Sequence, residues 1–324
     1  MGVSVEAKHR ASDAKAALRR IEGAVAQVIQ GKPEAIRLAV TTFAAGGHLL
    51  IEDVPGVGKT TLARALAKAV GGSFRRIQFT SDLLPSDILG SNVFNQRTGA
   101  FEFRPGPIFA NLVLADEINR TTPRTQSALL EAMSERKISI DGESHELGSP
   151  FMVIATQNPI EHFGTYPLPE SQMDRFLLRI RLGYPAPQDE RRVVLADPFE
   201  DVADEIEPVL DAVDLKAILL AVKRVRVEES LFGYAEQVVG ETRQSNLLQL
   251  GVSPRGFQAW LRAAKAYAQV SGRDFLVPDD LKETALSALS HRVVPTGGGD
   301  FDGHTQRESE RVIAYLLERV PVPM

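Results

Sequence analysis

Residues 53–61 combine glycines, a lysine and two threonines at a spacing that suits the binding of a triphosphate. The segment reads Asp53-Val54-Pro55-Gly56-Val57-Gly58-Lys59-Thr60-Thr61 and lies between an apolar run and a helix-like run. The glycines let backbone N–H groups turn inward on phosphates, Lys59 can neutralise the β- and γ-phosphates, and the Thr60 hydroxyl can ligate Mg²⁺. The dipole of the following helix adds to this attraction. We predict that all nine residues form a loop that binds ATP with Mg²⁺.

Two adjacent carboxylates, Asp116 and Glu117, follow the apolar run 112–115. A strand buried on both faces delivers its last residues to the carboxyl edge of a sheet, where α/β proteins bind ligands. There Asp116 can hold Mg²⁺ through water, and Glu117 can polarise the water that attacks the phosphate. The alternative is a strand that simply ends in a charged turn, but such a pair rarely follows a phosphate loop at this distance.

Asn158 directly follows a further apolar run, 151–157, and is expected at the same carboxyl edge of the sheet. Its amide could hydrogen-bond the γ-phosphate or the attacking water, since positioning that water is much of what phosphoryl-transfer catalysis requires. An isolated Asn before a proline more often forms a turn.

Arg175 and Arg255 are candidates for stabilising the charge that develops in the transition state. Arg255 follows Ser253 and Pro254, which suit the N-cap and first position of a helix, so we expect it to reach over the nucleotide of the same subunit. Arg175 precedes a strand-like run and could project into a neighbouring subunit's site. For both, an ordinary surface ion pair is the alternative.

Strand-like runs alternate with amphipathic helices in the first part of the chain, which predicts a parallel sheet covered on both faces. The expected strands are 48–52, 74–79, 112–116, 151–156 and 176–181. We expect an α/β fold, with a five-stranded ATPase core and an N-terminal helical segment over residues 1–184.

The second part, residues 185–324, is predicted to be an all-helical lid domain. Helical periodicity recurs over 215–225, 254–270, 278–290 and 306–318. Residues 197–214 contain eight acidic residues and no Lys or Arg, which indicates a solvated connector between the two domains that can be helical in part. Residues 296–300 are expected to form a flexible loop between the last two helices.

The composition excludes several classes of function. The chain of 324 residues has no cysteine, so disulfides, thiolate metal sites and cysteine catalysis are excluded. Its net charge of −5 gives no overall attraction to nucleic acid. Without a signal-peptide core or an apolar run near ~18 residues, we expect a cytoplasmic protein with no membrane span.

Taken together, these motifs resemble the AAA+ ATPases, and in detail the MoxR family of the helix-2-insert type. The similar stretches are 52–60, 97–107, 115–120, 126–133, 156–159, 168–176 and 253–255. Asp53, which replaces the first glycine of the general phosphate-loop pattern, is typical of this family. The resemblance implies two hairpins, over 93–103 and 137–147, which line the central pore in related hexamers.

The resemblance further implies a homo-oligomeric ring, expected to be a hexamer, which uses ATP hydrolysis to remodel or mature a client protein. The expected partner carries a von Willebrand factor A domain. Residues 29–31 resemble the adenine-contacting segment, although Lys32 replaces an expected Gln. Arg120 and Arg124 are rivals of Arg175 for the role of inter-subunit arginine.

Two other functions remain open from the sequence. A DNA-acting motor, such as a helicase or clamp-type ATPase, shares the same core, but the acidic charge and the lack of an appended basic domain argue against it. A nucleotide-binding scaffold without turnover is disfavoured by the intact pair of Asp116 and Glu117.

Overall fold

A five-stranded parallel sheet forms the centre of the molecule in a computed structural model that describes residues 2–158, 165–195, 202–210, 212–297 and 303–323. The strand order is β2-β5-β8-β1-β9, and each neighbouring pair is parallel. The strands are β1 (Leu49–Glu52), β2 (Phe74–Gln78), β5 (Leu112–Asp116), β8 (Met152–Gln157) and β9 (Leu178–Ile180). All five predicted strands are therefore confirmed, with ends that differ by two residues at most.

The sheet separates two apolar cores. Leu49 and Ile51 of β1 belong to one core, whereas Leu50 between them belongs to the other. In β5, Leu114 and Ala115 divide in the same way. Successive side chains of a strand point to opposite faces, so strands that are buried on both faces read as continuous apolar runs.

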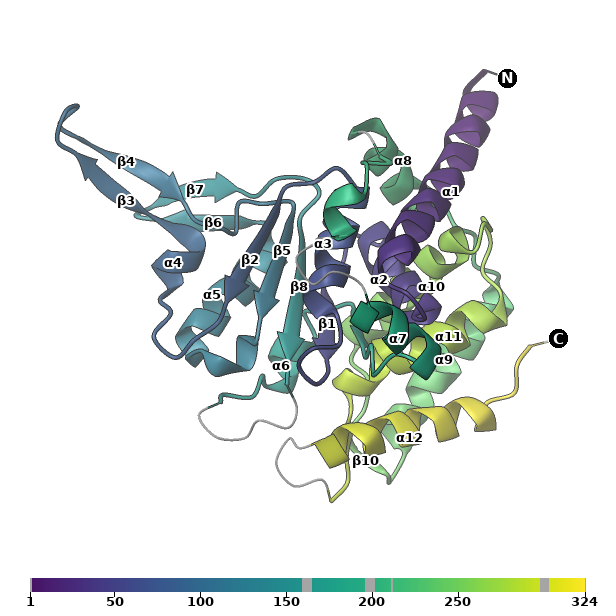
Figure 1. Ribbon diagram of the computed structural model, residues 1–324. Coiled ribbons are helices and arrows are strands. Elements are labelled where there is room, and N and C mark those ends of the chain that lie inside the picture. Colours follow the sequence, from purple (N-terminus) through teal and green to yellow (C-terminus); the bar gives the residue numbers. More distant parts are fainter. Residues whose placement is uncertain (1, 159–164, 196–201, 211, 298–302, 324) are drawn as a thin grey trace.

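Helices from the N-terminal half cover both faces of the sheet (Figure 1). One core contains residues of α1 (Gly2–Val28), α2 (Pro33–Ala44) and α3 (Lys59–Ala69). The other core contains residues of α4 (Pro85–Leu89), α5 (Pro123–Glu135) and α6 (Glu170–Met173). A 3₁₀ helix, Ile118–Arg120, directly follows the strand β5 and the residue Glu117.

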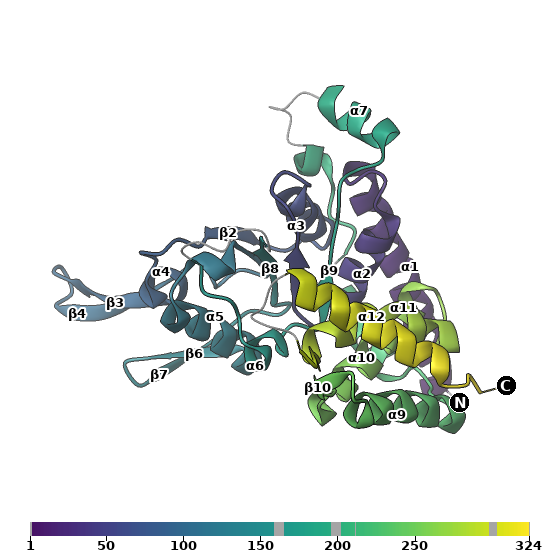
Figure 2. The same ribbon diagram turned by 90° about the horizontal axis from the view of Figure 1, so that it is seen from below.

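Two hairpins project from the side of the sheet opposite to the C-terminal helices (Figures 1 and 2). They are formed by β3 (Gly90–Asn95) with β4 (Ala100–Pro105), and by β6 (Lys137–Ile140) with β7 (Glu143–Glu146). Asp141 and Gly142, at the second tip, have φ of +50° and +85°, as a tight hairpin turn requires. Both hairpins that the resemblance implied are confirmed.

The C-terminal part is mostly helical, as predicted. Its helices are α7 (Pro187–Leu195), α8 (Ala212–Lys223), α9 (Glu229–Gln244), α10 (Pro254–Val270), α11 (Pro278–Leu289) and α12 (Gly303–Arg319), with a small sheet of β10 (Leu248–Leu250) and β11 (Val294–Pro295). Helix α9 was not predicted, because Gly233 and Gly240 weaken its helical signal. Helices α8 and α10 share one apolar core with α1 and α2.

The connector predicted over 197–214 is helical in part, but the prediction that it is solvated is wrong for some of its described residues. Residues 196–201 and 211 lie outside the described residues, but a 3₁₀ helix, Val202–Glu205, packs against α3. Ala203 and Ile206 are buried, and the Val209 N–H donates to the Ala69 carbonyl at 2.8 Å. The small apolar side chains between the acidic residues anchor this segment to the core. Of the predicted loop 296–300, residues 298–300 also lie outside the described residues.

No helix in the described part of the chain is both long and apolar enough to cross a lipid bilayer. The longest described helices, α1, α10 and α12, instead bury one apolar side in the protein core.

Candidate functional site

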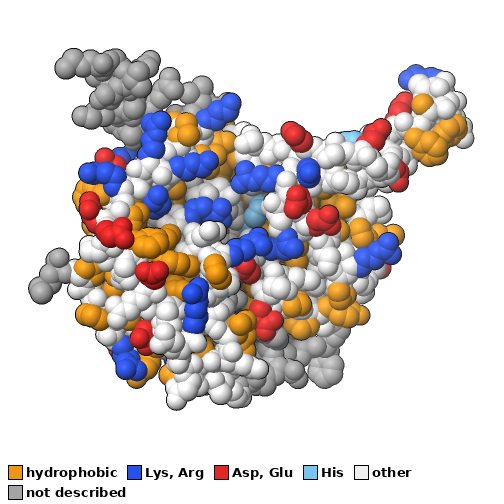
Figure 3. Space-filling view, turned by 180° about the vertical axis from the view of Figure 1, so that it is seen from behind, with side chains coloured by type: hydrophobic (Ala, Val, Ile, Leu, Met, Phe, Trp, Pro, Cys, Tyr) orange, Lys and Arg blue, Asp and Glu red, His pale blue; other side chains and the backbone are white. Residues whose placement is uncertain are grey.

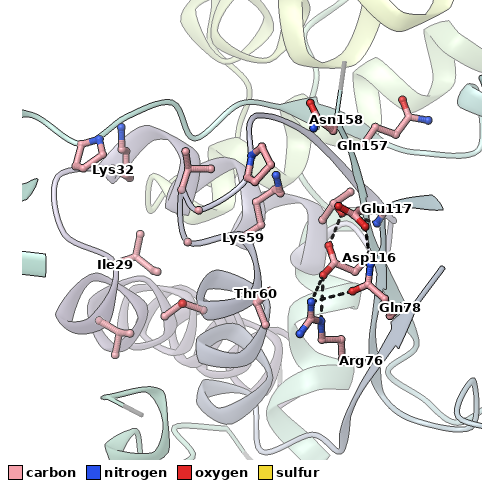
Figure 4. A pocket seen from close by; sticks show the side chains of 18 of the residues that line it. Ile29, Lys32, Lys59, Thr60, Arg76, Gln78, Asp116, Glu117, Gln157 and Asn158 are labelled. Carbon is pink, nitrogen blue, oxygen red and sulfur yellow. Dashed lines mark hydrogen bonds and ion pairs between the residues drawn. The ribbon is translucent and has the colours of Figure 1, made fainter. Parts of the chain in front are cut away.

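A cavity of about 640 Å³ lies at the carboxyl edge of the sheet (Figure 4). It brings together most of the residues that the sequence singled out. The lining residues are Val28, Ile29, Gln30, Lys32, Pro55, Gly56, Val57, Gly58, Lys59, Thr60, Thr61, Arg76, Gln78, Asp116, Glu117, Thr156, Gln157, Asn158 and Pro185. Three strands, β2, β5 and β8, therefore deliver polar side chains to a cavity whose volume is in the range of small-ligand sites.

The loop between β1 and α3 forms one wall of this cavity. Gly56 and Gly58 have φ of +83° and +91°, a backbone conformation that favours glycine, and α3 begins directly afterwards at Lys59. Lys59 Nζ donates to the carbonyls of Asp53 and Val54, at 2.8 Å each. Burial lowers the pKa of Lys59, although Asp53, Asp116 and Glu117 oppose this effect. The loop is thus a curled backbone with one ammonium group at its centre.

Asp53 does not line the cavity but anchors the loop from behind. Its Oδ2 accepts the backbone N–H groups of Leu182 and Gly183, at 2.7 and 2.5 Å, and its Oδ1 accepts that of Val54 at 2.9 Å. The side chain is buried. A glycine could make none of these bonds, which gives a physical reason for the carboxylate at this position.

Asp116 and Glu117 are held by side chains from the neighbouring strands. Thr156 Oγ1 donates to Asp116 Oδ1 at 2.6 Å and accepts the Glu117 N–H at 2.8 Å. Arg76 donates to Asp116 Oδ2 through two nitrogens, at 3.0 and 2.5 Å (Figure 4). Gln78 Nε2 donates to Glu117 Oε2 at 2.6 Å. These donors lie on the strands β2 and β8, and they hold the two carboxylates in position.

Sequence reasoning missed Arg76, Gln78 and Thr156. Arg76 and Gln78 alternate on β2, and the register places Gln78 opposite Asp116. Polar residues two apart at the end of a strand share a face, and this signal could have identified them. Glu117 also has a φ of +58°, which is uncommon for a residue other than glycine and often marks functional sites.

The remaining residues predicted for this edge lie as expected. Asn158 is buried at the end of β8 and lines the cavity. Ile29 and Gln30 line it from the segment after α1. Ile29 lies across the cavity from the two carboxylates (Figure 4). Lys32 Nζ donates to the Tyr184 carbonyl at 2.5 Å, and this bond ties the segment to the chain after β9.

Arg175 and Arg255 do not reach this cavity. They line another cavity, of about 320 Å³, together with Asp174, Leu177, Gln258, Ala259, Arg262 and Arg292. Arg175 donates to the Leu130 carbonyl at 3.1 Å and to Ser134 Oγ. Arg255 is 62% exposed, and its Nε lies 3.5 Å from Asp174 Oδ2.

The expectation that Arg255 reaches over the nucleotide of its own subunit therefore needs correction. Its local structure is as predicted, since Ser253 Oγ caps α10 by accepting the Gly256 N–H at 3.0 Å. The orientation of α10 determines that Arg255 points away from the sheet-edge cavity. Buried Arg292 packs against Gly256 in the first turn of α10 and donates to Asp174 Oδ1 at 2.7 Å, so the start of α10 lies beside the Asp174 carboxylate.

The rival arginines lie apart from this second cavity. Arg120 Nε is 3.3 Å from Glu117 Oε2, on the side of the first cavity, and Arg124 is exposed in the first turn of α5.

Comparisons with known proteins cover both the sheet and the C-terminal helices. Residues 48–178 match the family model described as "ATPase family associated with various cellular activities (AAA)", and residues 240–312 match the model described as "AAA lid domain". The chain is 46% identical over 298 residues to uncharacterized protein YeaC of Bacillus subtilis, with 92% of each chain covered. It is 40% identical over 309 residues to chaperone MoxR1 of Mycobacterium tuberculosis, covering 92% of this chain and 80% of that one.

Two further similarities extend over most of the chain. Protein MoxR of Methylorubrum extorquens is 32% identical over 306 residues, with 87% of this chain and 89% of that one covered. A crystal structure of a Cytophaga hutchinsonii protein, provisionally described as an ATPase, superimposes with a TM-score of 0.89 at 34% identity over the full length of both chains.

Proposed function

Because the chain belongs to the MoxR family of AAA+ ATPases, we propose that it uses ATP hydrolysis at the sheet-edge cavity to remodel a client protein. The observation that carries this proposal is the convergence of Lys59, Asp116 and Glu117 on one cavity. A lysine beside a curled backbone loop binds phosphates, and a carboxylate next to it activates water.

In the proposed mechanism the loop amides and Lys59 bind the phosphates of ATP. Lys59 exchanges its two carbonyl acceptors for phosphate oxygens, which carry more negative charge. Glu117 takes a proton from the attacking water as the bond between the γ-phosphorus and the bridging oxygen breaks. Asn158 orients this water, and Gln78 keeps the Glu117 carboxylate in place.

The residues present also fit a magnesium ion. The Thr60 hydroxyl and the Asp116 carboxylate line the same cavity as Lys59, and oxygen donors are the ligands that Mg²⁺ prefers. Such an ion would supply positive charge that neutralises the negative charge developing on the phosphates. Arg76 occupies one Asp116 oxygen, so we expect it to release that oxygen when the ion binds.

We propose that Arg175 and Arg255 serve the nucleotide of a neighbouring subunit in a homo-oligomeric ring, expected to be a hexamer. They share a cavity that none of the loop residues lines, which supports action on another subunit's ATP. An arginine supplied in this way can be worth about 10³–10⁵ in rate. A lone subunit is then a poor ATPase.

Family membership also supports a proposal for the cellular role and the partner. We propose a chaperone-like role, with a partner that carries a von Willebrand factor A domain. The name of the Mycobacterium tuberculosis relative, chaperone MoxR1, supports the first part. We also retain the division into an ATPase core, 1–184, and a helical lid, 185–324. A DNA-acting motor is not favoured, because the relatives that match about nine tenths of the chain include MoxR proteins.

Affinity capture with a variant that holds ATP tests the proposed function. We expect Glu117→Gln protein with ATP to enrich a von Willebrand factor A protein and its associated complex from the native lysate. Lys59→Ala is the matched control, because it loses the phosphate contact. Enrichment of nucleic acid with repair or replication proteins would instead support a motor function.

A further inference from the structure

A basic cavity of about 530 Å³ lies apart from the sheet-edge cavity and is not used in the proposed mechanism. It is formed by the end of α2, the end of α5, and one side each of α8 and α10. Its lining residues are Ala44, Ala45, Gly46, Arg136, Leu219, Val222, Lys223, Gln258, Leu261, Arg262 and Lys265. Figure 3 shows Lys and Arg side chains around a hollow in the middle of the face opposite to Figure 1.

The basic cavity carries uncompensated positive charge. Four of its lining side chains are cations, namely Arg136, Lys223, Arg262 and Lys265, and none is Asp or Glu. Among the described residues, none of these four forms an ion pair with a carboxylate. Like charges at one site repel each other, and an anion relieves this repulsion when it binds.

The pKa shifts of two residues in or near the basic cavity are consistent with its uncompensated positive charge. Burial lowers the pKa of the Arg262 guanidinium, and the nearby Arg136 and Arg255 lower it further. Arg136 and Arg262 also contribute to lowering the pKa of the buried His48, after burial itself. The contributions of the neighbouring arginines, as distinct from burial, indicate a positive potential beside Arg262.

Two of the cations are held in place by backbone carbonyls. Arg136 donates to the Gly46 carbonyl at 2.9 Å, and Lys265 Nζ donates to the Lys223 carbonyl at 3.3 Å. Gly46 has a φ of +62°, and a Cβ there would lie 3.2 Å from Leu219 Cδ2. The close approach of these segments fixes the cations before any ligand binds, which lowers the entropic cost of binding.

Shape and chemistry together define the ligand. Arginine guanidinium groups recognise phosphate through paired hydrogen bonds, and lysines add point charges. Leu219, Val222 and Leu261 give the basic cavity an apolar wall. Its volume lies in the range of small-ligand sites.

We propose that the basic cavity binds a small molecule bearing two or more phosphate charges, distinct from the ATP at the sheet edge. Gln258 and Arg262 also line the cavity of Arg175 and Arg255. A bound polyanion beside Arg262 therefore changes the field at these two arginines. This regulatory consequence rests on the proposed function, in which both arginines act on a neighbour's ATP, whereas the binding itself does not.

The test measures binding of inorganic pyrophosphate to the full chain by isothermal titration calorimetry at low salt. Lys59→Ala serves as the parent, because it removes the phosphate contact at the sheet edge. We expect saturable binding to this parent and a loss of about ten- to hundredfold in affinity when Arg262→Gln is added, as for the loss of a charged hydrogen bond. Lys282→Gln, an exposed change on α11, is the matched control and should leave the affinity unchanged.

A second variant and a second measurement keep the result decisive. If Arg262→Gln unfolds the protein, Lys223→Gln removes another cation of the basic cavity from the exposed end of α8. No binding to the parent, or equal affinity in both variants, would overturn the proposal. The proposal would also be overturned if a variant bound pyrophosphate as tightly as the parent but sedimented differently. The cations would then bind an acidic segment of a neighbouring copy of the chain. The ATPase rate of the unmodified chain tests the proposed function separately.

Discussion

Removal of the Asp53 carboxylate should loosen the phosphate loop without touching the nucleotide cavity. The carboxylate accepts three backbone N–H groups, two of them from residues 129 and 130 positions later in the chain. Asp53→Gly introduces the residue that general phosphate loops have here, and it leaves the N–H groups of Leu182 and Gly183 without this acceptor. Each unsatisfied buried donor costs about 1–3 kcal/mol, so the two together should cost about 2–6 kcal/mol.

Asp53→Asn provides a second, milder change at the same atom positions. The amide keeps one acceptor oxygen but loses the negative charge and must direct its NH₂ group at one of the donors. Because hydrogen bonds to charged groups contribute about 1 kcal/mol more than neutral ones, we expect a loss of about 2–4 kcal/mol over the three bonds. Asn should therefore be no more stable than Asp, although it fills the same space.

The assay is guanidinium unfolding followed by circular dichroism, together with titration of a fluorescent ATP analogue. We expect both variants to unfold earlier and to bind ATP more weakly, because the curl of the loop depends on its anchor. Asp274→Asn, at an exposed carboxylate, is the matched control. If Asp53→Gly were as stable as the parent within about 0.5 kcal/mol, the anchoring role of Asp53 would be refuted.

Three further results are expected. Glu117→Gln should bind ATP but hydrolyse it about 10²–10⁴ times more slowly, as for the loss of a general base, and near-parent turnover in a phosphate-release assay would contradict its role. Lys59→Ala should lose ATP affinity. If Arg175 acts on a neighbouring subunit's ATP, mixing the Lys59→Ala and Arg175→Ala proteins should restore part of the ATPase rate, and no recovery at any mixing ratio would contradict that role of Arg175. Burial lowers the pKa of His48 to about 4, so between that pH and about 6.5 the unfolded chain binds a proton that the folded chain does not. The free energy of unfolding should fall by about 3 kcal/mol as the pH drops through this window, and His48→Gln should flatten the fall seen in unfolding midpoints at pH 7 and pH 4.5.

The core of the fold could be predicted from the sequence because its signals are local. The apolar runs before Asp53 and Asp116 predicted strands buried on both faces, and the glycines before Lys59 predicted the turn into α3. The carboxyl ends of parallel strands meet at one edge, so the residues after them had to come together. Helix α9 was not predicted, because its two glycines weaken an otherwise regular helical spacing of apolar residues.

The partners of these residues depend on packing between distant segments. The bonds from Asp53 to residues 182 and 183 and from Arg76 to Asp116 join positions that no local pattern connects. The position of Arg255 depends in the same way on its approach to Asp174, a carboxylate that Arg292 also contacts. The sequence by itself determined the strands, the phosphate loop and the edge where they meet, because backbone conformation follows from neighbouring residues. Only the tertiary structure decided which side chains hold the carboxylates and which way the arginines face, because those contacts depend on how whole elements pack.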